Sequence, residues 1–182
     1  MIERIEIDPQ ELNLSVYSTW KKRWFLLTAG DYTSRKFNSM TVAWGGLGAM
    51  WDRPFAMVVV RPSRYTFEYM ERYPTFTLCR FPEGNKKALL FCGSKSGREV
   101  DKIKQCGLTP MASTKIDAPG FTEAELIIEC KKIYSDDYKP DRFLAEHIER
   151  SYRSKNYHRI YFGEIEAIWG TAGFKSSSRQ AL

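Results

Sequence analysis

Short runs rich in β-branched and aromatic residues recur between turn signals along this chain, and they constrain its fold more than any other feature. They predict six strands, at residues 23–28, 40–44, 55–60, 75–81, 125–133 and 159–168. The run 55–60 is apolar throughout, which indicates an interior strand. Gly163 lies in the middle of the last run, where it indicates a β-bulge or the close approach of another backbone or a ligand.

Four segments between these runs have the punctuation of short helices, at residues 64–72, 86–91, 97–105 and 141–152. Gly107 follows the third segment and is its expected C-terminal cap. The connections are too short for a regular alternation of strands and crossover helices, so the pattern predicts an antiparallel barrel with helices packed around it. We expect one domain over residues 1–173 and a polar tail at 174–182.

Composition narrows the classes of function. Of the 182 residues 43% are hydrophobic and 27% charged, which is typical of a globular protein and argues against disorder. The net charge of +6 favours an anionic ligand but is too small to indicate nucleic acid. The longest apolar run has six residues against the about 20 of a membrane span, and the charged N-terminus does not resemble a signal peptide, so we expect a cytoplasmic protein without a membrane partner.

The four cysteines are widely spaced and form no CxxC pair. With only two histidines in the chain, neither a zinc site nor a redox pair is expected. The cysteines are interpreted as reduced thiols that pack in the core or between helices, and no metal site is predicted.

Residues 38–48, Asn-Ser-Met-Thr-Val-Ala-Trp-Gly-Gly-Leu-Gly, form the first candidate site. Polar and apolar side chains alternate there before three glycines, so main-chain and hydroxyl donors can line the edge of a planar ring while a tryptophan flanks it. The alternative is a glycine-bearing hairpin with one core tryptophan.

The second candidate site is Arg-Pro-Ser-Arg-Tyr-Thr at residues 61–66, where a buried strand ends and a helix begins. Ser63 is expected at the N-cap. The free amides of a helix start, together with two arginines and two hydroxyls, favour a phosphate. The alternative is an ordinary helix cap with arginines in solvent.

The third candidate site is Cys-Gly-Ser-Lys-Ser-Gly-Arg at residues 92–98, which is expected to precede a helix. Two glycines there enclose hydroxyls and a lysine, a composition typical of an anion-binding nest of amides. It is no Walker loop, because GxxxxGK[ST] is absent. A flexible basic turn is the alternative.

The runs NSMTVAWGGLG, RPSRYT and CGSKSGREVDK, with the later HRIYFGEIEAIW, resemble the flavin reductase-like family, including its flavoredoxin group. The resemblance spans about residues 15–170. It implies an FMN-binding split β-barrel, usually a homodimer. Together with the strand pattern, this leads us to expect a mainly β (α+β) fold, a six-stranded antiparallel split β-barrel with Greek-key connections and short peripheral helices.

Carried over residue by residue, the resemblance implies three groups of contacts. The isoalloxazine would be lined by Asn38, Ser39, Met40, Thr41 and Trp44. The ribityl phosphate would be met by Arg61, Ser63, Arg64 and Thr66, with Lys95, Ser96 and Gly97 closing over it. His158 is the candidate on the nicotinamide side, with a surface residue at a strand start as the alternative.

The resemblance leaves two functions open. The first is an NAD(P)H-dependent flavin reductase, in which NADH or NADPH passes a hydride to FMN and the protein supplies position and electrostatics. The second is an FMN-binding electron-transfer protein that serves an acceptor protein. A third interpretation, a basic barrel that binds nucleic acid through residues 86–104, is disfavoured because acidic residues interrupt that charge run.

Overall fold

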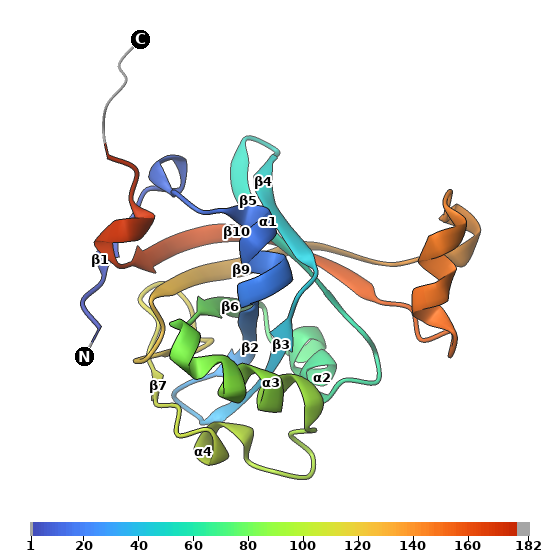
Figure 1. Ribbon diagram of the computed structural model, residues 1–182, viewed down its shortest axis with the longest axis horizontal. Helices are drawn as coiled ribbons and strands as arrows, with labels where there is room; N and C mark the ends of the chain where they lie inside the picture. The colour runs from blue at the N-terminus through green and yellow to red at the C-terminus, as the bar shows by residue number, and fades with distance from the viewer. Residues whose placement is uncertain (1, 178–182) are drawn as a thin grey trace.

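The computed structural model describes residues 2–177, which fold around one antiparallel sheet (Figure 1). The sheet contains β1 (Ile5–Glu6), β2 (Phe25–Asp31), β3 (Lys36–Val42), β4 (Gly45–Met50), β5 (Arg53–Val60), β6 (Thr75–Arg80), β9 (Leu126–Asp137) and β10 (Arg159–Gly170). A separate ribbon pairs β7 (Pro110–Met111) with β8 (Gly120–Phe121). The α-helices are α1 (Val16–Ser18), α2 (Tyr65–Arg72), α3 (Lys86–Ser94) and α4 (Lys102–Gln105).

Shorter helical turns connect these elements. A π-helical turn covers Thr19–Arg23, and 3₁₀ turns cover Pro9–Glu11, Glu83–Asn85, Pro140–Arg142, Glu146–Tyr152 and Ala172–Phe174.

The strand order shows that the sheet curls on itself. Its main path runs β3-β2-β6-β9-β10-β5-β4, so that β3 and β4 lie at its two ends. These two strands are nevertheless consecutive in the chain, separated by Ala43 and Trp44 alone. The two ends must therefore meet at this connection, although no ladder joins β3 to β4 among the described residues. The result is a barrel with a split between β3 and β4.

A Greek-key connection carries the chain across the barrel. After β5 the chain passes through α2 to β6, and β9 and β10 then return so that β10 pairs with β5. The expected fold class, a mainly antiparallel sheet with Greek-key connections and short peripheral helices, is confirmed. The number of strands is larger than the six predicted.

The apolar residues form two cores because the strands bury both faces. On β2, Phe25, Leu27 and Ala29 point into the barrel, while Leu26 packs with α3 residues such as Leu89 on the outer face. All four are buried completely. This explains why β2 is apolar without alternation. The outer core attaches α3 to the barrel beside β3.

Most predicted strands differ from the observed ones by a few residues at their ends. The prediction 40–44 is the exception, because β3 begins at Lys36 and ends at Val42, before Trp44. The glycine-rich strand β4 was not predicted. It forms by pairing with β5 across a tight turn at Trp51 and Asp52, both of which have positive φ. For residues 45–50 the glycine-bearing hairpin is thus the correct alternative, but Trp44 is half exposed and is no core residue.

Two predicted helices are wrong in part. Of residues 97–105 only α4 is helical, because the Asp101 side chain accepts the Lys104 N–H and caps the helix there. Cys106, and not Gly107, is its C-cap, and Gly107 follows it with a φ of +63°. Residues 141–152 form 3₁₀ turns instead of an α-helix. They belong to a segment that projects from the barrel (orange in Figure 1) and offers a helix little packing surface.

The fold continues past the predicted domain boundary at residue 173. Phe174 is buried, with the Arg80 guanidinium over its ring, and Lys175 pairs with Leu12. The last five residues of the predicted tail, 178–182, lie outside the described residues. Within residues 2–177, no helix has the length and apolar character needed to cross a membrane.

Gly163 has the role that the sequence indicated. The register between β10 and β9 shifts between Phe162 and Gly163, so a β-bulge occurs there. A Cβ atom on Gly163 would lie 2.6 Å from the Phe76 ring and 2.8 Å from Cβ of Cys130. Gly163 on β10 therefore lies so close to side chains of β9 and β6, the next strands of the sheet, that only glycine fits.

We expect Gly163→Ala to lower the free energy of unfolding by about 1–3 kcal/mol, because the added methyl group overpacks the barrel. Urea denaturation monitored by fluorescence would measure the loss. Gly84→Ala is the matched control, since a Cβ there meets nothing within 4 Å. Equal stability of the Gly163→Ala variant and the wild type would contradict this account of the bulge.

Candidate functional site

A cleft opens where the barrel is split. The cavity measures about 190 Å³ and is lined by Met40, Thr41, Val42, Ala43, Trp44, Val59, Arg61 and His158. The end of β3 forms one wall, and the end of β5 with the residue before β10 forms the other. Met40, Thr41 and Trp44, three of the five ring candidates, thus line one cavity with Arg61 and His158. Asn38 and Ser39 do not line it.

The main chain of β3 is available at this cleft. Within residues 2–177, β3 pairs with β2 only, so its other edge has no strand partner there. The carbonyl of Ser39 points to that free edge, where it accepts a hydrogen bond from Nζ of Lys102. In an antiparallel strand, both main-chain groups of every second residue point to the same edge. The N–H and C=O of Thr41 therefore face the free edge as well, next to the cavity.

His158 joins the cleft to the projecting segment 138–158. Its Nδ1 lies 2.8 Å from the Tyr152 hydroxyl, and its ring lies 5.2 Å from that of Trp44. Burial, reinforced by the charge of Arg61, lowers the pKa of His158 to about 4. The imidazole is neutral at pH 7 and is buried, so the alternative of a surface residue is wrong.

Two arginines beside the cleft lack a carboxylate partner among the described residues. Arg61 donates to the Ser151 carbonyl at 2.8 Å and lies over the Tyr152 ring. Arg64 donates to the Gly93 carbonyl. Burial first, and then the charge of Arg61, lower the pKa of Arg64. This partly buried, uncompensated positive charge favours an anion.

The start of α2 differs from its prediction. Arg64, and not Ser63, is the N-cap residue, and its side chain makes no cap hydrogen bond. The Ser63 hydroxyl instead accepts from Nδ2 of Asn156 in the projecting segment, and its carbonyl accepts from Arg98. The amides at the start of α2 are therefore not satisfied by a serine cap.

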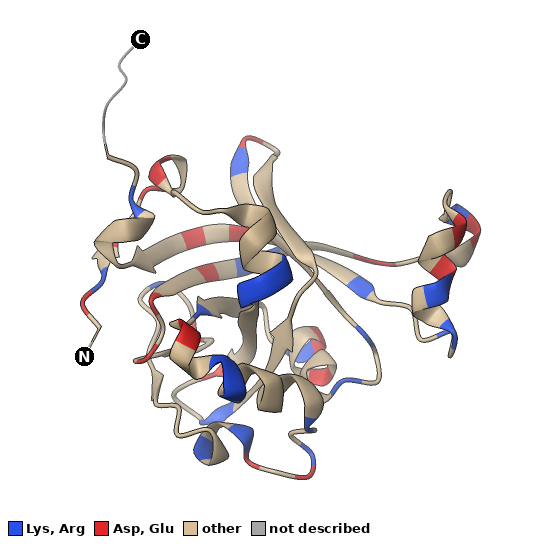
Figure 2. Cartoon of the chain, viewed as in Figure 1, with Lys and Arg blue, Asp and Glu red and all other residues tan. Residues whose placement is uncertain are grey.

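The turn 95–98 lies at the end of a helix and not before one. Lys95 is the C-cap of α3, and α4 begins only at Lys102, so the expected contribution of a helix N-terminus is wrong here. The turn is nevertheless basic, and its Gly97 lies against the Asn38 side chain of β3. The exposed Lys95 has no ion pair among the described residues, and the Ser96 hydroxyl accepts from the Arg98 N–H at 3.2 Å. Figure 2 shows Lys and Arg residues along this turn and α4.

Three of the predicted contacts have buried side chains that bond within the protein. The Ser39 hydroxyl lies 2.8 Å from that of Thr28, and Asn38 donates to the hydroxyl of the buried Thr66 at 2.6 Å. The Thr41 hydroxyl also bonds internally, to the Leu89 carbonyl of α3. These side chains hold β3 against β2, α2 and α3. Their direct contact with a cofactor stays a prediction.

The structure links the two halves of the site through Gly93. A Cβ atom there would lie 3.3 Å from Cβ of Thr41, and its carbonyl accepts from Arg64. The ring candidates on β3 and the anion candidates on α2 thus contact the same residue of α3. Among residues 2–177, no group of three His, Cys, Asp or Glu residues could hold a metal ion.

The sequence matches the family model described as flavin reductase like domain over residues 19–177, which is most of the chain. The chain belongs to the flavin reductase-like family. Its fold is the split barrel of that family. The search of curated proteins found no match to this sequence.

Solved structures of the flavin reductase-like family have the same fold. Flavoredoxin of Desulfovibrio vulgaris (Miyazaki F) is 24% identical with a TM-score of 0.64, over 83% of this chain and 70% of the other. Flavoredoxin from Methanosarcina acetivorans is 22% identical with a TM-score of 0.66, over 96% and 81%. The NADH:FAD oxidoreductase SgcE6 of Streptomyces globisporus is 16% identical with a TM-score of 0.59, over 80% and 74%.

Sequence reasoning missed Lys102, Tyr152 and Arg98 as parts of the site. Arg98 stands in the same basic turn as the predicted residues, and that position was the available signal. Lys102 is buried with its Nζ on the carbonyls of Ser39 and Cys92, which fixes β3 to α3. Burial lowers the pKa of Lys102 to about 8. No local pattern distinguishes it from its exposed neighbours.

The pKa of Lys102 predicts a pH dependence of stability. Between about pH 8 and pH 10 the folded protein loses this proton while the unfolded chain keeps it, so unfolding binds a proton and stability rises with pH. We expect the free energy of unfolding of the wild type to rise by about 1–3 kcal/mol relative to Lys102→Met over this range. Chemical denaturation at each pH measures the difference. Lys87→Met, which changes an exposed lysine of α3, should show no such trend, and a flat difference for Lys102→Met would refute the assignment.

Proposed function

We propose that this protein binds FMN in the cleft of the split barrel and acts as an NAD(P)H-dependent flavin reductase. The observation that carries the proposal is the contact of Gly93 with both Thr41 and Arg64. This contact places the unpaired main-chain edge of β3 next to arginines that have no carboxylate partner among the described residues. The main-chain edge can form hydrogen bonds with a flat polar ring, and the arginines can bind its phosphate tail.

The free edge of β3 supplies the groups for the ring. The main-chain N–H and C=O of Thr41 match the alternating donors and acceptors on the pyrimidine rim of a flavin. Trp44 is half exposed at the mouth of the cavity, where it can cover one end of the ring. The hydrogen bonds of Thr41 and Lys102 to α3 and β3 hold this edge rigid before a ligand arrives.

The phosphate would bind between the start of α2 and the turn 95–98. Arg64 begins α2 and Lys95 begins the turn, and the two segments are joined where Arg98 donates to the Ser63 carbonyl. Arg61 is close enough to lower the pKa of Arg64. A dianion there relieves the repulsion between the two guanidinium groups and accepts charge-assisted hydrogen bonds. Arg98 is held by Glu68 and supports the turn from outside.

FMN bound in this cleft would supply the redox chemistry, accepting a hydride from NADH or NADPH. The protein would position the nicotinamide at the open face, bordered by Trp44 and His158. His158 is uncharged at neutral pH and fixed by Tyr152, so it would serve as a packing and hydrogen-bonding group for the nicotinamide. No acid or base side chain is required for this transfer.

Similar proteins support flavin binding and leave the electron donor open. The names of related structures include an FMN-binding protein from Thermus thermophilus, flavoredoxins and an NADH:FAD oxidoreductase. The second candidate function is therefore an FMN-binding carrier that takes electrons from another donor and serves an acceptor protein. The half-exposed Trp44 beside the cleft favours this second function, because an acceptor protein can reach the edge of the ring there.

A homodimer in the cytoplasm is part of the same proposal. Trp51 and Tyr134 are exposed and lie with Phe55 and Phe162 in a chain of aromatic contacts with centroid distances of 5.1–6.5 Å. An exposed aromatic cluster of this kind is typical of an interaction surface. Sedimentation of the wild type and of Trp51→Ser would test whether a second copy covers it.

We expect Arg64→Ala to weaken FMN binding by tenfold or more, about 1.4 kcal/mol, and riboflavin binding by much less, because riboflavin has no phosphate. Flavin fluorescence quenching measures both affinities. Arg53→Ala, which removes an exposed arginine of the β4–β5 hairpin, is the control and should leave both unchanged. Equal losses for FMN and riboflavin in Arg64→Ala would contradict the phosphate site.

Anaerobic stopped-flow mixing separates the reductase from the carrier. We expect the bound flavin to bleach with NADH or NADPH at a rate that saturates with nucleotide concentration, because the cleft holds the nicotinamide before transfer. If neither nucleotide bleaches a flavin that dithionite reduces, the protein is a carrier and the reductase assignment is wrong.

A further inference from the structure

Two of the four cysteines are in contact where α3 meets α4. Sγ of Cys92 and Sγ of Cys106 lie 3.9 Å apart, although the two residues are 14 positions apart in the chain. The other two thiols, Cys79 and Cys130, are fully buried on β6 and β9. The contact brings together two groups that can be oxidised to a disulfide, and nothing in the proposed hydride transfer uses them.

The two thiols in contact differ in exposure. Cys92 is fully buried in α3, whereas Cys106, the C-cap of α4, is partly exposed. Burial first, and then the neighbouring Cys106, raise the pKa of Cys92 to about 12, so this thiol keeps its proton at neutral pH. The Lys102 ammonium is close enough to favour a thiolate at either sulfur. An oxidant from solvent therefore reaches Cys106 first, and Cys92 is the adjacent thiol that can react next.

We propose that Cys92 and Cys106 form a reversible disulfide on oxidation by a peroxide, and that this disulfide weakens FMN binding. The proposal departs from the sequence-based expectation that no redox pair exists, because the fold and not a short spacing brings the two thiols together. Its first half stands on the contact of the two sulfur atoms, and its second half rests on the proposed function.

The reaction balances with hydrogen peroxide as the oxidant. Sγ of Cys106 attacks one peroxide oxygen, the O–O bond breaks, and the leaving hydroxide takes up the Cys106 proton as water. The sulfur is thereby oxidised to a sulfenic acid. Sγ of Cys92 then attacks this sulfur, so that the S–S bond forms, the S–O bond breaks, and a second water leaves with the Cys92 proton. Two thiols and one peroxide give one disulfide and two waters, and a reducing dithiol reverses the change by exchange.

The disulfide would displace residues that hold the flavin site. Sulfur atoms in a disulfide are about 2.05 Å apart, so the 3.9 Å separation must close by about 1.9 Å. Gly93, which follows Cys92, lies against Thr41. On α4, Lys102 donates to the carbonyl of Ser39. The edge of β3 is thus fixed by both helices that the disulfide moves, and binding sites tolerate displacements of only about 0.5 Å.

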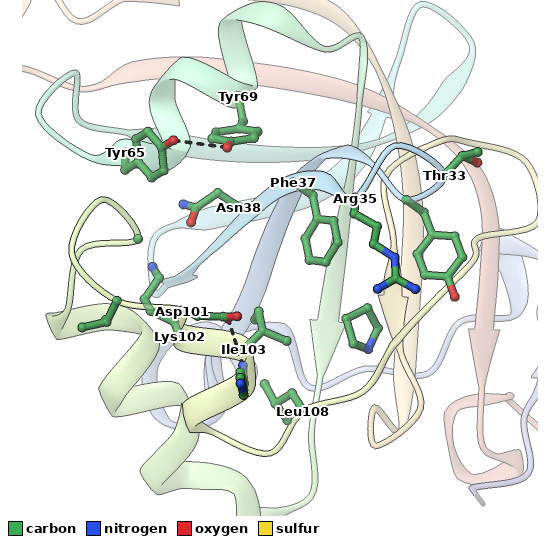
Figure 3. Close-up of a pocket in the computed structure, with 15 residues that line it drawn as sticks. Thr33, Arg35, Phe37, Asn38, Tyr65, Tyr69, Asp101, Lys102, Ile103 and Leu108 are labelled. Carbon is green, nitrogen blue, oxygen red and sulfur yellow. Dashed lines mark hydrogen bonds between the residues drawn. The ribbon is translucent and has the colours of Figure 1, made fainter.

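A large cavity beside α4 leaves room for this movement. It measures about 890 Å³ and is formed by the β2–β3 hairpin, α2 and the segment from the turn 95–98 through α4 (Figure 3). Figure 3 shows Lys102 and Ile103 on one side of the cavity and Tyr65 on the other. Because α4 is a single turn of four residues with open space on this side, few packed side chains resist its displacement.

A thiol titration tests the disulfide by itself. We expect a small excess of hydrogen peroxide to remove two of the four thiols of the wild type, and dithiothreitol to restore them. Mass spectrometry of the digested protein should find residues 92 and 106 linked. Cys106→Ser, at a partly exposed position, should keep its remaining thiols, and Cys79→Ala is the matched control that should still lose two. A wild type that keeps all four thiols, or that links other cysteines, overturns the proposal.

Flavin titrations of the oxidised and reduced protein test the consequence. We expect the oxidised wild type to bind FMN at least threefold more weakly than the reduced wild type, and peroxide to leave the FMN affinity of Cys106→Ser unchanged. Equal affinities of the two wild-type forms, with the disulfide present, overturn the second half of the proposal. If neither form binds FMN, the proposed function fails and the second half fails with it, while the thiol titration still decides whether the disulfide forms.

Discussion

The connection between β3 and β4 determines the rest of this structure. Two residues join strands that lie at opposite ends of the sheet. A connection of two residues is too short to span an open sheet, so the sheet must curl until its two ends meet. In the part of the chain that the structure describes, no ladder joins the two ends, and the main chain of β3 has no strand partner next to the connection. A sheet edge in solvent is a liability for aggregation. Here α3, Lys102 and the turn 95–98 cover part of the edge, and the remainder forms the walls of the two cavities.

Two kinds of positively charged side chain, one buried and the other half-buried, have different roles at this edge. Lys102 is buried and donates hydrogen bonds to two carbonyls, so its ammonium group holds strand and helix together. Arg61 and Arg64 each bond to one carbonyl and repel each other, so their charge is left over. In a protein of modest net charge, this local excess is a more specific indication of an anionic ligand than the overall value of +6.

The sequence predicted what depends on local pattern and missed what depends on distant pairing. Strands made of β-branched residues were recognised, whereas β4 was not, because glycines have low strand propensity and its stability comes from pairing with β5. Thr41, Trp44, Arg61 and His158 were expected near one another from the family resemblance and do line one cavity. The burial of His158 could not be read locally, since Tyr152 and Trp44 reach it from two separate segments. The large cavity was also missed, because its walls come from four parts of the chain.

The projecting segment 138–158 has a consequence for how members of this family can diverge. Its tip carries the fully exposed Leu144, while its base bonds to Arg61, Ser63 and the cleft through Ser151, Asn156 and His158. Insertions and deletions at the tip leave the barrel intact, yet any that shift the base alter the mouth of the cleft. Changes in the projecting segment can thus alter access to the cleft, in evolution or by engineering, while the barrel that shapes the cleft stays the same.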